Sequence, residues 1–294
     1  MIKQIVREKE GYFFIGHILA MFFGLAGLLL VLPHPEFVAN LPPIGQSAFS
    51  WSMIGGGVVY MILGWATIAL FAYRKLGLWH WLGFMIPALG ISLTSELLGT
   101  STGFPFGDYH YLSGLGYKIS GLVPFTIPLS WFYLGFCGYI ITRVGLEKLS
   151  LPSSVKDLGA IIFGSLLLTS WDFVLDPAMS QTSMPFWLWD QPGAFFGMPY
   201  QNFIGWFGTG VVFMSVATIV WRFKPLDFNK IPLTIPIGVY IGNFTFAMVM
   251  SIGANFYIPV LLGIFTGILP LVIFVSLAYK SESGNSIGLP FLSQ

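Results

Sequence analysis

Three carboxylic acids lie within or at the end of long apolar runs, where charged side chains are rare. Asp172 and Asp176 close the run "LGAIIFGSLLLTSWDFVLD", and Glu96 lies near the end of "GLWHWLGFMIPALGISLTSELL". The two aspartates are four residues apart, so they share one face of a helix, and we expect Pro177 to end that helix near the negative end of its dipole. Burial disfavours a charged carboxyl, and like charges one turn apart disfavour double ionisation. We therefore expect at least one aspartate to keep its proton at neutral pH and to act as a proton donor.

Further polar residues accompany these acids in the apolar runs. They are Ser92, Ser165, Thr169, Asn202, Thr209 and Asn243. Polar residues in membrane spans nearly always face the interior of a helix bundle or a water-filled cavity, so they are functional candidates by default. The simpler alternative is that acids at the end of a span reach interfacial water and have no chemical role.

Two predicted loops, 99–118 and 177–200, follow the acid-bearing runs, and each contains another acid, Asp108 or Asp190. Both loops are rich in aromatic residues, as "FPFGDYHY" and "MPFWLWDQP" illustrate. We expect the loops and the acid-bearing helix ends to meet at one membrane face and to form the site there. Two simpler alternatives stay open: the rings form an interfacial belt, where Trp and Tyr concentrate, and the loop acids are solvated.

The composition is that of an integral membrane protein. Of the 294 residues, 55% are hydrophobic and 9% are charged, whereas a soluble domain has about 25% charged residues. Eight apolar runs are long enough to cross about 30 Å of hydrocarbon as helices. They lie at 12–32, 49–73, 79–98, 119–143, 157–176, 201–221, 233–253 and 256–279. The predicted fold class is all-α, a polytopic transmembrane helix bundle of about eight spans, with a single domain over 1–280 and a flexible tail over 281–294.

The distribution of basic residues predicts the orientation of the bundle. If the N-terminus is cytoplasmic, eight spans place the N-terminal tail, every second loop and the C-terminus on the same side. These segments, with their flanking residues, contain 12 of the 13 Lys and Arg residues, and Lys118 is the exception. Because cytoplasmic loops of membrane proteins are enriched in Lys and Arg, both termini are predicted to be cytoplasmic and the acids to face outward.

The sequence lacks the patterns of several common kinds of site. The four histidines do not have the close spacing of a di-iron or haem site. The chain contains no GxGxxG motif after a strand and no P-loop, and its single Cys137 excludes a disulfide within the chain. We therefore expect no metal, no cofactor and no nucleic acid as a partner. The expected partners are a hydrophobic substrate, water and membrane lipids.

Three other functions that use intramembrane acids stay open on this evidence. Asp172 and Asp176 form a DxxxD pattern, with which prenyl-transferring membrane enzymes hold Mg²⁺ and diphosphate. A diphosphate also calls for Lys or Arg nearby, and the predicted outer face offers only Lys118. A proton-coupled transporter would use the acids as a relay, although the chain shows no inverted repeat of the kind common in transporters. A lipid-binding protein is the third alternative.

Acid chemistry on an apolar substrate fits these residues better. A protonated carboxyl in an apolar, aromatic pocket can protonate an alkene. The cation that forms is stabilised by the faces of Trp, Tyr and Phe rings. Aromatic residues make up 17% of the chain, so such a lining is easily supplied.

Three stretches of the sequence resemble the shared motifs of the CruF-type carotenoid hydratases, a family of membrane proteins in carotenoid biosynthesis. They are "SELLGTSTGFPFGDYHY" (95–111), "SWDFVLDPAM" (170–179) and "FWLWDQPGAFFGMPYQNFIGW" (186–206). The resemblance extends over essentially the whole chain in length and number of spans. It implies addition of water to the 1,2 (or 1′,2′) double bond of an acyclic ψ end group, without a metal or redox cofactor.

The resemblance also implies the kinds of substrate and the setting. In cyanobacterial members the substrate is γ-carotene on the route to myxol-type glycosides, in archaeal members a bacterioruberin precursor, and in some bacterial members lycopene. We expect this protein in a bacterial, cyanobacterial, plasma or thylakoid membrane. Other enzymes of carotenoid biosynthesis are candidate partners.

The expected mechanism gives each candidate residue a role. Asp172 or Asp176 protonates C2 of the alkene, and Glu96 or Asp108 orients and deprotonates the incoming water, as in general acid–base catalysis. The residues expected to shape the pocket and bind the substrate are Tyr109, Tyr111, Trp171, Trp189, Asp190, Asn202 and Trp206.

Overall fold

The computed structural model describes residues 8–182, 184–191 and 193–280. Within this part of the chain, eight helices are long and apolar enough to cross a membrane, which confirms the predicted all-helical bundle of about eight spans. They are α2 (Lys9–Ala26) with η1 (Gly27–Val31), α4 (Pro43–Leu76), α5 (Leu78–Thr102), α6 (Thr126–Glu147), α7 (Ser153–Ser180), α8 (Tyr200–Arg222), α9 (Thr234–Gly253), and α10 (Tyr257–Gly263) with η3 (Ile264–Ile268) and α11 (Leu269–Tyr279). The predicted flexible tail, 281–294, lies outside the described residues.

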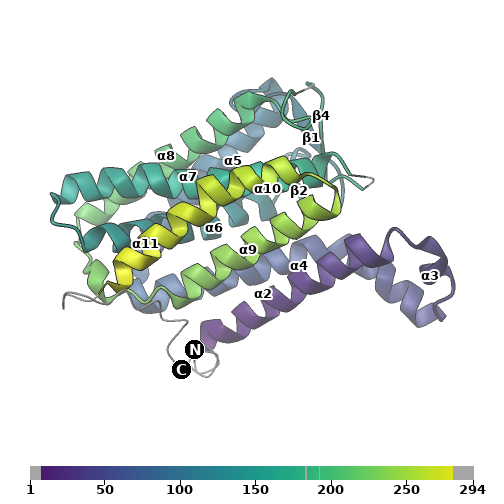
Figure 1. Ribbon diagram of the computed structural model, residues 1–294, viewed down its shortest axis with the longest axis horizontal. Helices are drawn as coiled ribbons and strands as arrows, with labels where there is room; N and C mark the ends of the chain where they lie inside the picture. The colour runs from purple at the N-terminus through teal and green to yellow at the C-terminus, as the bar shows by residue number, and fades with distance from the viewer. Residues whose placement is uncertain (1–7, 183, 192, 281–294) are drawn as a thin grey trace.

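Short elements fill the connections between the spans. They are α3 (Pro35–Ala39), β1 (Tyr109–Tyr111), β2 (Lys118–Ile119), β3 (Val123–Pro124), β4 (Trp187–Trp189) and η2 (Phe228–Lys230). The strands form two small antiparallel ribbons, β1 with β4 and β2 with β3. The β1–β4 ribbon lies at the end of the bundle where α5 and α7 end (Figure 1).

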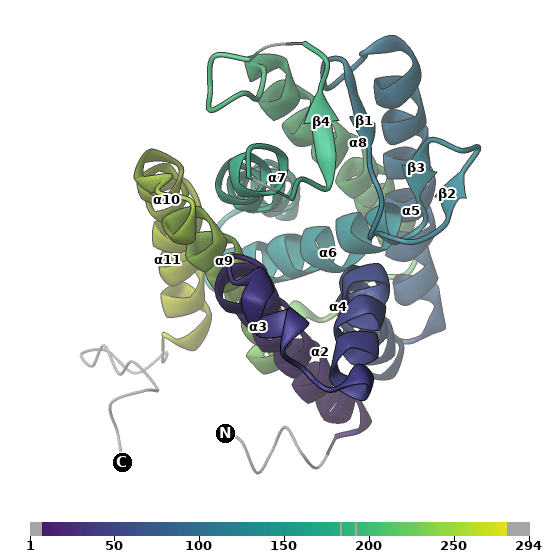
Figure 2. The ribbon, with the colours of Figure 1, turned by 90° about the vertical axis from the view of Figure 1, so that its right-hand side faces the viewer.

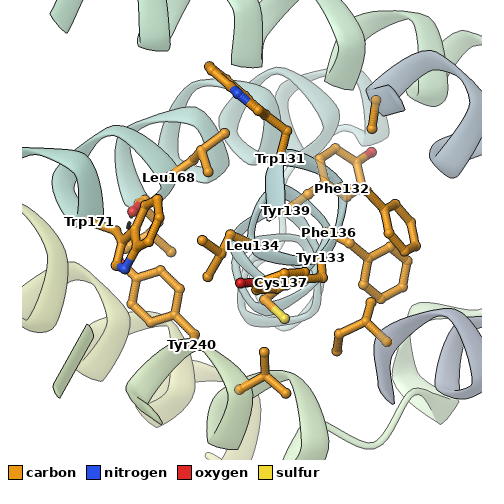
Figure 3. Packing of buried hydrophobic residues seen from close by; sticks show 14 of the residues in the cluster. Trp131, Phe132, Tyr133, Leu134, Phe136, Cys137, Tyr139, Leu168, Trp171 and Tyr240 are labelled. Atoms are coloured by element: carbon orange, nitrogen blue, oxygen red, sulfur yellow. Dashed lines mark hydrogen bonds between the residues drawn. The ribbon is translucent and has the colours of Figure 1, made fainter. Parts of the chain in front are cut away.

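Helix α6 is the centre of the bundle. It packs against α4, α5, α7, α9 and α11, while α2 packs against α4 and α9, and α8 against α5 and α7 (Figure 2). Bulky side chains point away from α6 on every side, among them Trp131, Tyr133 and Phe136, and all three are buried (Figure 3). A helix that is apolar all round belongs either in a core or in lipid, and here neighbouring helices cover α6 on nearly every side.

Two glycines allow α6 and α7 to approach each other closely. A Cβ at Gly138 of α6 would lie 2.8 Å from the backbone oxygen of Gly164, and a Cβ at Gly164 would lie 2.9 Å from the Cα of Tyr139. Small residues at a crossing bring helix backbones into contact, which is a main source of helix association in membranes. The crossing fixes the position of α7 and of the two aspartates near its end.

We expect Gly138→Ala to destabilise the bundle by about 1–3 kcal/mol, because the added methyl group meets backbone atoms that cannot rotate away. The matched control is Gly90→Ala on α5, where an added Cβ has no described atom within 4 Å. Alanine there is expected to be neutral or stabilising by about 0.5–1 kcal/mol. Thermal unfolding in detergent, followed by circular dichroism, measures both. Equal melting temperatures for the two variants would contradict the close crossing.

Two predicted boundaries are wrong. Helix α7 continues through Pro177 to Ser180, so Pro177 does not end it. The last turn is held by hydrogen bonds from Ser180 Oγ to the carbonyl of Asp176 (2.8 Å) and from the Gln181 amide to the carbonyl of Pro177 (3.0 Å), and neighbouring helices make a proline tolerable in a membrane span. Both aspartates are therefore inside the helix. The fourth span begins at Thr126 rather than 119, because the β2–β3 hairpin takes up the preceding residues.

The basic residues gather at the end of the bundle opposite the β1–β4 ribbon, where α2 and α7 begin and α4, α6 and α8 end. Arg74 pairs with Glu8 at 2.8 Å, and Arg222 pairs with Asp157 at 3.0 Å. The N-terminal end of α2 and the C-terminal end of α11 lie at this same end (Figure 1). The predicted separation of a basic end from an acid-bearing end is therefore present in space. Which end faces the cytoplasm stays a prediction.

Candidate active site

The β1–β4 ribbon covers the acid-bearing end of the bundle with four aromatic rings. Tyr109 pairs with Trp189 and Tyr111 pairs with Trp187 across the two strands. Because side chains alternate along a strand, all four rings point to the same side of the ribbon, and all four line the same cavity beneath it. The middle residue of each strand points the other way and is exposed.

Glu96 of α5 is buried and accepts three hydrogen bonds from side chains. Its Oε2 accepts from the hydroxyl of Tyr109 and from that of Tyr111, the latter at 2.9 Å. Its Oε1 accepts from Nε1 of Trp131 on α6 at 2.9 Å. An ionised carboxylate can only accept hydrogen bonds, so three converging donors suit an anion. Glu96 is thereby held rigidly between α5, α6 and the ribbon.

The two ribbon tyrosines act as donors because they keep their protons. Burial, together with the nearby Glu96 carboxyl, raises the pKa of Tyr109 and of Tyr111 well above the ordinary value of a phenol. Removing water disfavours the phenolate, and a neighbouring negative charge disfavours it further. Both hydroxyls therefore stay neutral over the physiological pH range.

Asp172 of α7 is buried and is oriented by a residue of α8. Nδ2 of Asn202 donates a hydrogen bond to Oδ2 of Asp172 at 2.8 Å. The same Nδ2 lies 2.7 Å from the sulfur of Met198, which follows the ribbon. The adjacent Trp171 is fixed by a hydrogen bond of 3.2 Å from its Nε1 to the carbonyl of Asn243 on α9. Side chains of α7 and α8 and a backbone carbonyl of α9 thus hold the middle of the site.

Asp176 lies one turn further along α7 and, like Asp172, accepts one side-chain hydrogen bond. Its Oδ1 accepts from Nε1 of Trp187 on the ribbon. Its Oδ2 is buried and has no hydrogen-bond partner among the described residues, and the same is true of Nε1 of Trp189. Buried polar atoms are usually paired, so an unpaired one indicates a place for a proton, a water molecule or a substrate.

All three acids line one cavity of about 760 Å³, together with Asn202 and the four ribbon rings. Most of the remaining wall is apolar and comes from α2 and α4. The polar residues therefore form one end wall of a long apolar cavity. The volume of the whole cavity suits a drug-sized or larger ligand.

Two indole rings, Trp171 and Trp206, form the side wall next to the acids, and a third, Trp131, packs against Trp206. The rings of Trp131 and Trp206 are stacked, with centroids 4.0 Å apart and planes at 17°. The centroid of Trp171 lies 5.9 Å from that of Trp206. Trp171 and Trp206 line the cavity, and a positive charge in front of them would be attracted by the negative faces of the rings.

Nine of the eleven predicted site residues line this cavity. They are Glu96, Tyr109, Tyr111, Trp171, Asp172, Asp176, Trp189, Asn202 and Trp206. They come from α5, α7, α8 and both strands of the ribbon, so residues 110 positions apart in the sequence meet at one place. Their chemical roles stay predictions.

Asp108 and Asp190, the other two predicted residues, lie outside the cavity. Both are exposed; Oδ2 of Asp190 pairs with Nδ1 of His110 at 2.9 Å, and Asp108 lies over Gly103 at the end of α5. The reason is their position immediately next to the inward-facing residues Tyr109 and Trp189, because alternation turns neighbouring side chains to the outer face. The predicted roles of Asp108 in handling water and of Asp190 in binding substrate do not fit this geometry.

Most of the polar residues that accompany the acids in the apolar runs do not line the cavity. Thr169 is buried and donates to the carbonyl of Ser165 at 2.8 Å, within α7 itself. Asn243 belongs to a separate cluster, in which its Nδ2 lies 2.9 Å from Nε2 of His17 and its Oδ1 accepts from Tyr133 at 3.3 Å. Of the six accompanying polar residues only Asn202 lines the cavity.

Two residues of the site are absent from the predicted set: Trp131, which holds Glu96, and Trp187, which holds Asp176. For Trp187 a signal existed, because "YHY" and "WLW" both alternate with period two and can pair as strands. For Trp131 there was no local signal, since a tryptophan in an apolar span is ordinary.

The arrangement is suited to proton transfer in an apolar chamber. It combines a carboxyl that accepts three hydrogen bonds, a second acid oriented by an amide, and a third with a buried, unpaired oxygen. Within the part of the chain that the structure describes, no three His, Cys, Asp or Glu side chains are grouped so as to hold a metal ion.

Comparison with known proteins gives two similarities. The model of a family described as "carotenoid biosynthesis protein" matches residues 56–270. The chain is also similar to a bisanhydrobacterioruberin hydratase from the archaeon Haloarcula japonica, with 33% identity over 128 residues, which are 44% of this chain and 40% of that protein. No solved structure matches.

Proposed function

Because this chain belongs to the carotenoid biosynthesis protein family, we propose that it is a hydro-lyase that adds water to the 1,2 double bond of an acyclic ψ end group. The substrate is a long polyene of the γ-carotene, lycopene or bisanhydrobacterioruberin type. The similarity to a bisanhydrobacterioruberin hydratase supports the reaction class. The observation that carries the proposal is the unpaired Oδ2 of Asp176 inside an apolar cavity that also contains two other acids.

Asp176 is the general acid of this mechanism. Its Oδ2 carries the proton, and the π electrons of the alkene take that proton at C2, so that the positive charge forms at the more substituted C1. In each aspartate one oxygen accepts a described hydrogen bond, Oδ2 of Asp172 from Asn202 and Oδ1 of Asp176 from Trp187. We assign the acid to Asp176 because its other oxygen, Oδ2, is fully buried at the apolar cavity without a described partner. A positioned acid contributes about 10²–10⁴-fold to a reaction of this kind.

Asp172 is the base that completes the reaction. A water molecule beside Asp172 attacks C1 with an oxygen lone pair, and Asp172 takes the proton that leaves this water at Oδ1, the oxygen that Asn202 does not occupy. The product is a tertiary alcohol, and one water molecule has been consumed. Because Asp172 and Asp176 are neighbours one helical turn apart, the proton returns from the first to the second through water and resets the site.

Glu96 and the indole wall stabilise the intermediate cation. The three donors fix the charge of Glu96 before the reaction starts, and a preorganised charge in a water-poor site is a strong source of transition-state stabilisation. Trp171 and Trp206 present their rings to the same chamber.

We assign the supply of water to a neighbouring cavity of about 280 Å³ at the same end of the bundle. This cavity shares Leu28, Met179 and Phe186 with the main one, and its wall includes the polar Gln181 and Thr182, beyond the end of α7. The end of a membrane-length polyene would meet water at this level.

The proposal is tested by expressing the protein in cells that accumulate lycopene, γ-carotene or bisanhydrobacterioruberin and measuring the mass of the pigments. We expect at least one pigment to gain the mass of one water molecule. A gain of one oxygen atom would mean an oxygenase. Unchanged pigments in all three strains would contradict the proposal and favour a proton-coupled transporter or a lipid-binding protein.

A further inference from the structure

The cavity does not end at the acids but continues between α2 and α4. Its wall includes the segments 19–28 of α2 and η1 and 51–61 of α4, and nearly all of those lining side chains are apolar. The acids lie at one end of the cavity. The apolar remainder, lined by 19–28 and 51–61, is called the arm below.

The arm opens to the lipid. Phe23 and Trp51 line the cavity, and yet 62% and 77% of their surfaces are exposed. A side chain that lines a cavity and also faces outward marks the edge of its mouth. Both residues lie on helices that are long and apolar enough to cross a membrane, and we take the medium outside this mouth to be lipid.

Glycines keep the arm wide. A Cβ at Gly27, Gly55 or Gly56 would have no described atom within 4 Å, and all three residues line the cavity. In most helix crossings glycines allow backbones to touch, as Gly138 and Gly164 do here. These three glycines instead border open space in the cavity, so the missing side chains widen the arm and do not bring helices together.

We infer that the polyene enters sideways from the bilayer between α2 and α4 and lies along Gly27, Gly55 and Gly56 with its end group at the acids. This assignment rests on the proposed function, and it makes these glycines the residues that admit a long, straight chain. The occupant is apolar because the arm is apolar and opens to lipid, and it is continuous with the acid site because one cavity includes both.

The test replaces Gly56 and, separately, Gly27 with phenylalanine, whose ring projects into the arm. We expect the fraction of pigment hydrated in cells to fall by about tenfold or more, the effect of about 1.4 kcal/mol. The matched controls are Gly90→Phe on α5 and Gly208→Phe on α8. Each of these glycines also has no described atom within 4 Å of an added Cβ, but neither lines the cavity. The controls are expected to stay within about twofold of the unmodified protein, because exposed substitutions away from a site have small effects.

A binding measurement separates this inference from the proposed reaction. Asp176→Asn protein, alone and combined with Gly56→Phe or Gly90→Phe, is purified in detergent from the pigmented cells, and bound polyene is measured by its visible absorbance per protein. We expect Gly56→Phe to remove most of the pigment and Gly90→Phe to keep it. Loss of pigment only with Gly56→Phe, while the protein with Asp176 intact hydrates no pigment in the cells, would support the arm and contradict the proposed reaction. The inference would be overturned if Gly56→Phe and Gly90→Phe hydrated the pigment equally and also bound equal amounts of it. It would likewise be overturned if the two variants hydrated the pigment equally and none of the Asp176→Asn proteins retained any bound pigment.

Discussion

Asp176→Asn is expected to reduce the yield of hydrated pigment by at least about 100-fold, since a general acid contributes about 10²–10⁴-fold. The amide cannot release a proton to an alkene carbon. The structure should survive, because the asparagine keeps an oxygen at the position of Oδ1, which accepts from Trp187, and places its NH₂ group where Oδ2 has no described partner. Pigment extraction and mass analysis, normalised to the amount of folded membrane protein, measure the effect.

The control for this prediction is Asp108→Asn. Asp108 lies in the loop next to the site but is exposed and does not line the cavity. Exposed substitutions away from a site change stability by about 0.5 kcal/mol or less, so we expect hydration close to that of the unmodified protein. Equal loss in the two variants would show that the acids act through the general charge of this membrane face. Full activity of Asp176→Asn would remove it as the acid.

Glu96→Gln is expected to lower hydration by about 10²–10³-fold, the effect of removing one preorganised electrostatic contact. The variant should also be less stable by about 1–3 kcal/mol, because it leaves a buried donor unpaired. Both Glu96 oxygens accept hydrogen bonds, two from phenol hydroxyls and one from an indole. A glutamine offers one oxygen and one NH₂ group, so at least one of these donors must face another donor.

Removing one of the donors to Glu96 tests whether the charge of Glu96 or the packing around it matters for activity. Tyr109→Phe removes one donor but keeps the Glu96 charge and two of its hydrogen bonds. We expect it to lose less activity than Glu96→Gln, and we expect the double variant to lose less than the product of the two effects, because contacting groups are not additive. Hydration rates and melting temperatures of Glu96→Gln, Tyr109→Phe and the double variant, compared with the unmodified protein, complete this double-mutant cycle. A larger loss for Tyr109→Phe than for Glu96→Gln would contradict a role for the negative charge.

The fold and the main acids were predictable from the sequence because membrane constraints act locally. Each span must be long and apolar, so the eight helices can be identified one at a time. Within such runs Glu96, Asp172 and Asp176 stand out by type alone, since acids inside a span are costly and face an interior. Glu96 lies near the end of the third predicted span and the two aspartates at the end of the fifth. Because odd-numbered spans run in the same direction across the membrane, these ends were expected at the same face.

The rest of the site depended on pairing that no local rule determines. Whether Asp108 or Tyr109 faces inward is set by the β1–β4 register, and a shift of one residue would exchange them. The role of Trp131 depends on the packing of α6 against α5, and the extension of α7 past Pro177 depends on neighbours that surround its last turn. The lipid-facing arm depends on the open space that the described residues leave beside three glycines, which only the assembled helices reveal.

The most direct measurement follows the atoms of water into the product. Protein reconstituted in lipid with the polyene is incubated in deuterated water or in water enriched in heavy oxygen, and the product is analysed after exchangeable hydrogens have been returned to the light isotope. Proton donation by a carboxyl that exchanges with water predicts one carbon-bound deuterium at C2 and one heavy oxygen at C1 in every hydrated end group. A hydroxylated product with no deuterium at C2, or with oxygen from a source other than water, would contradict the account.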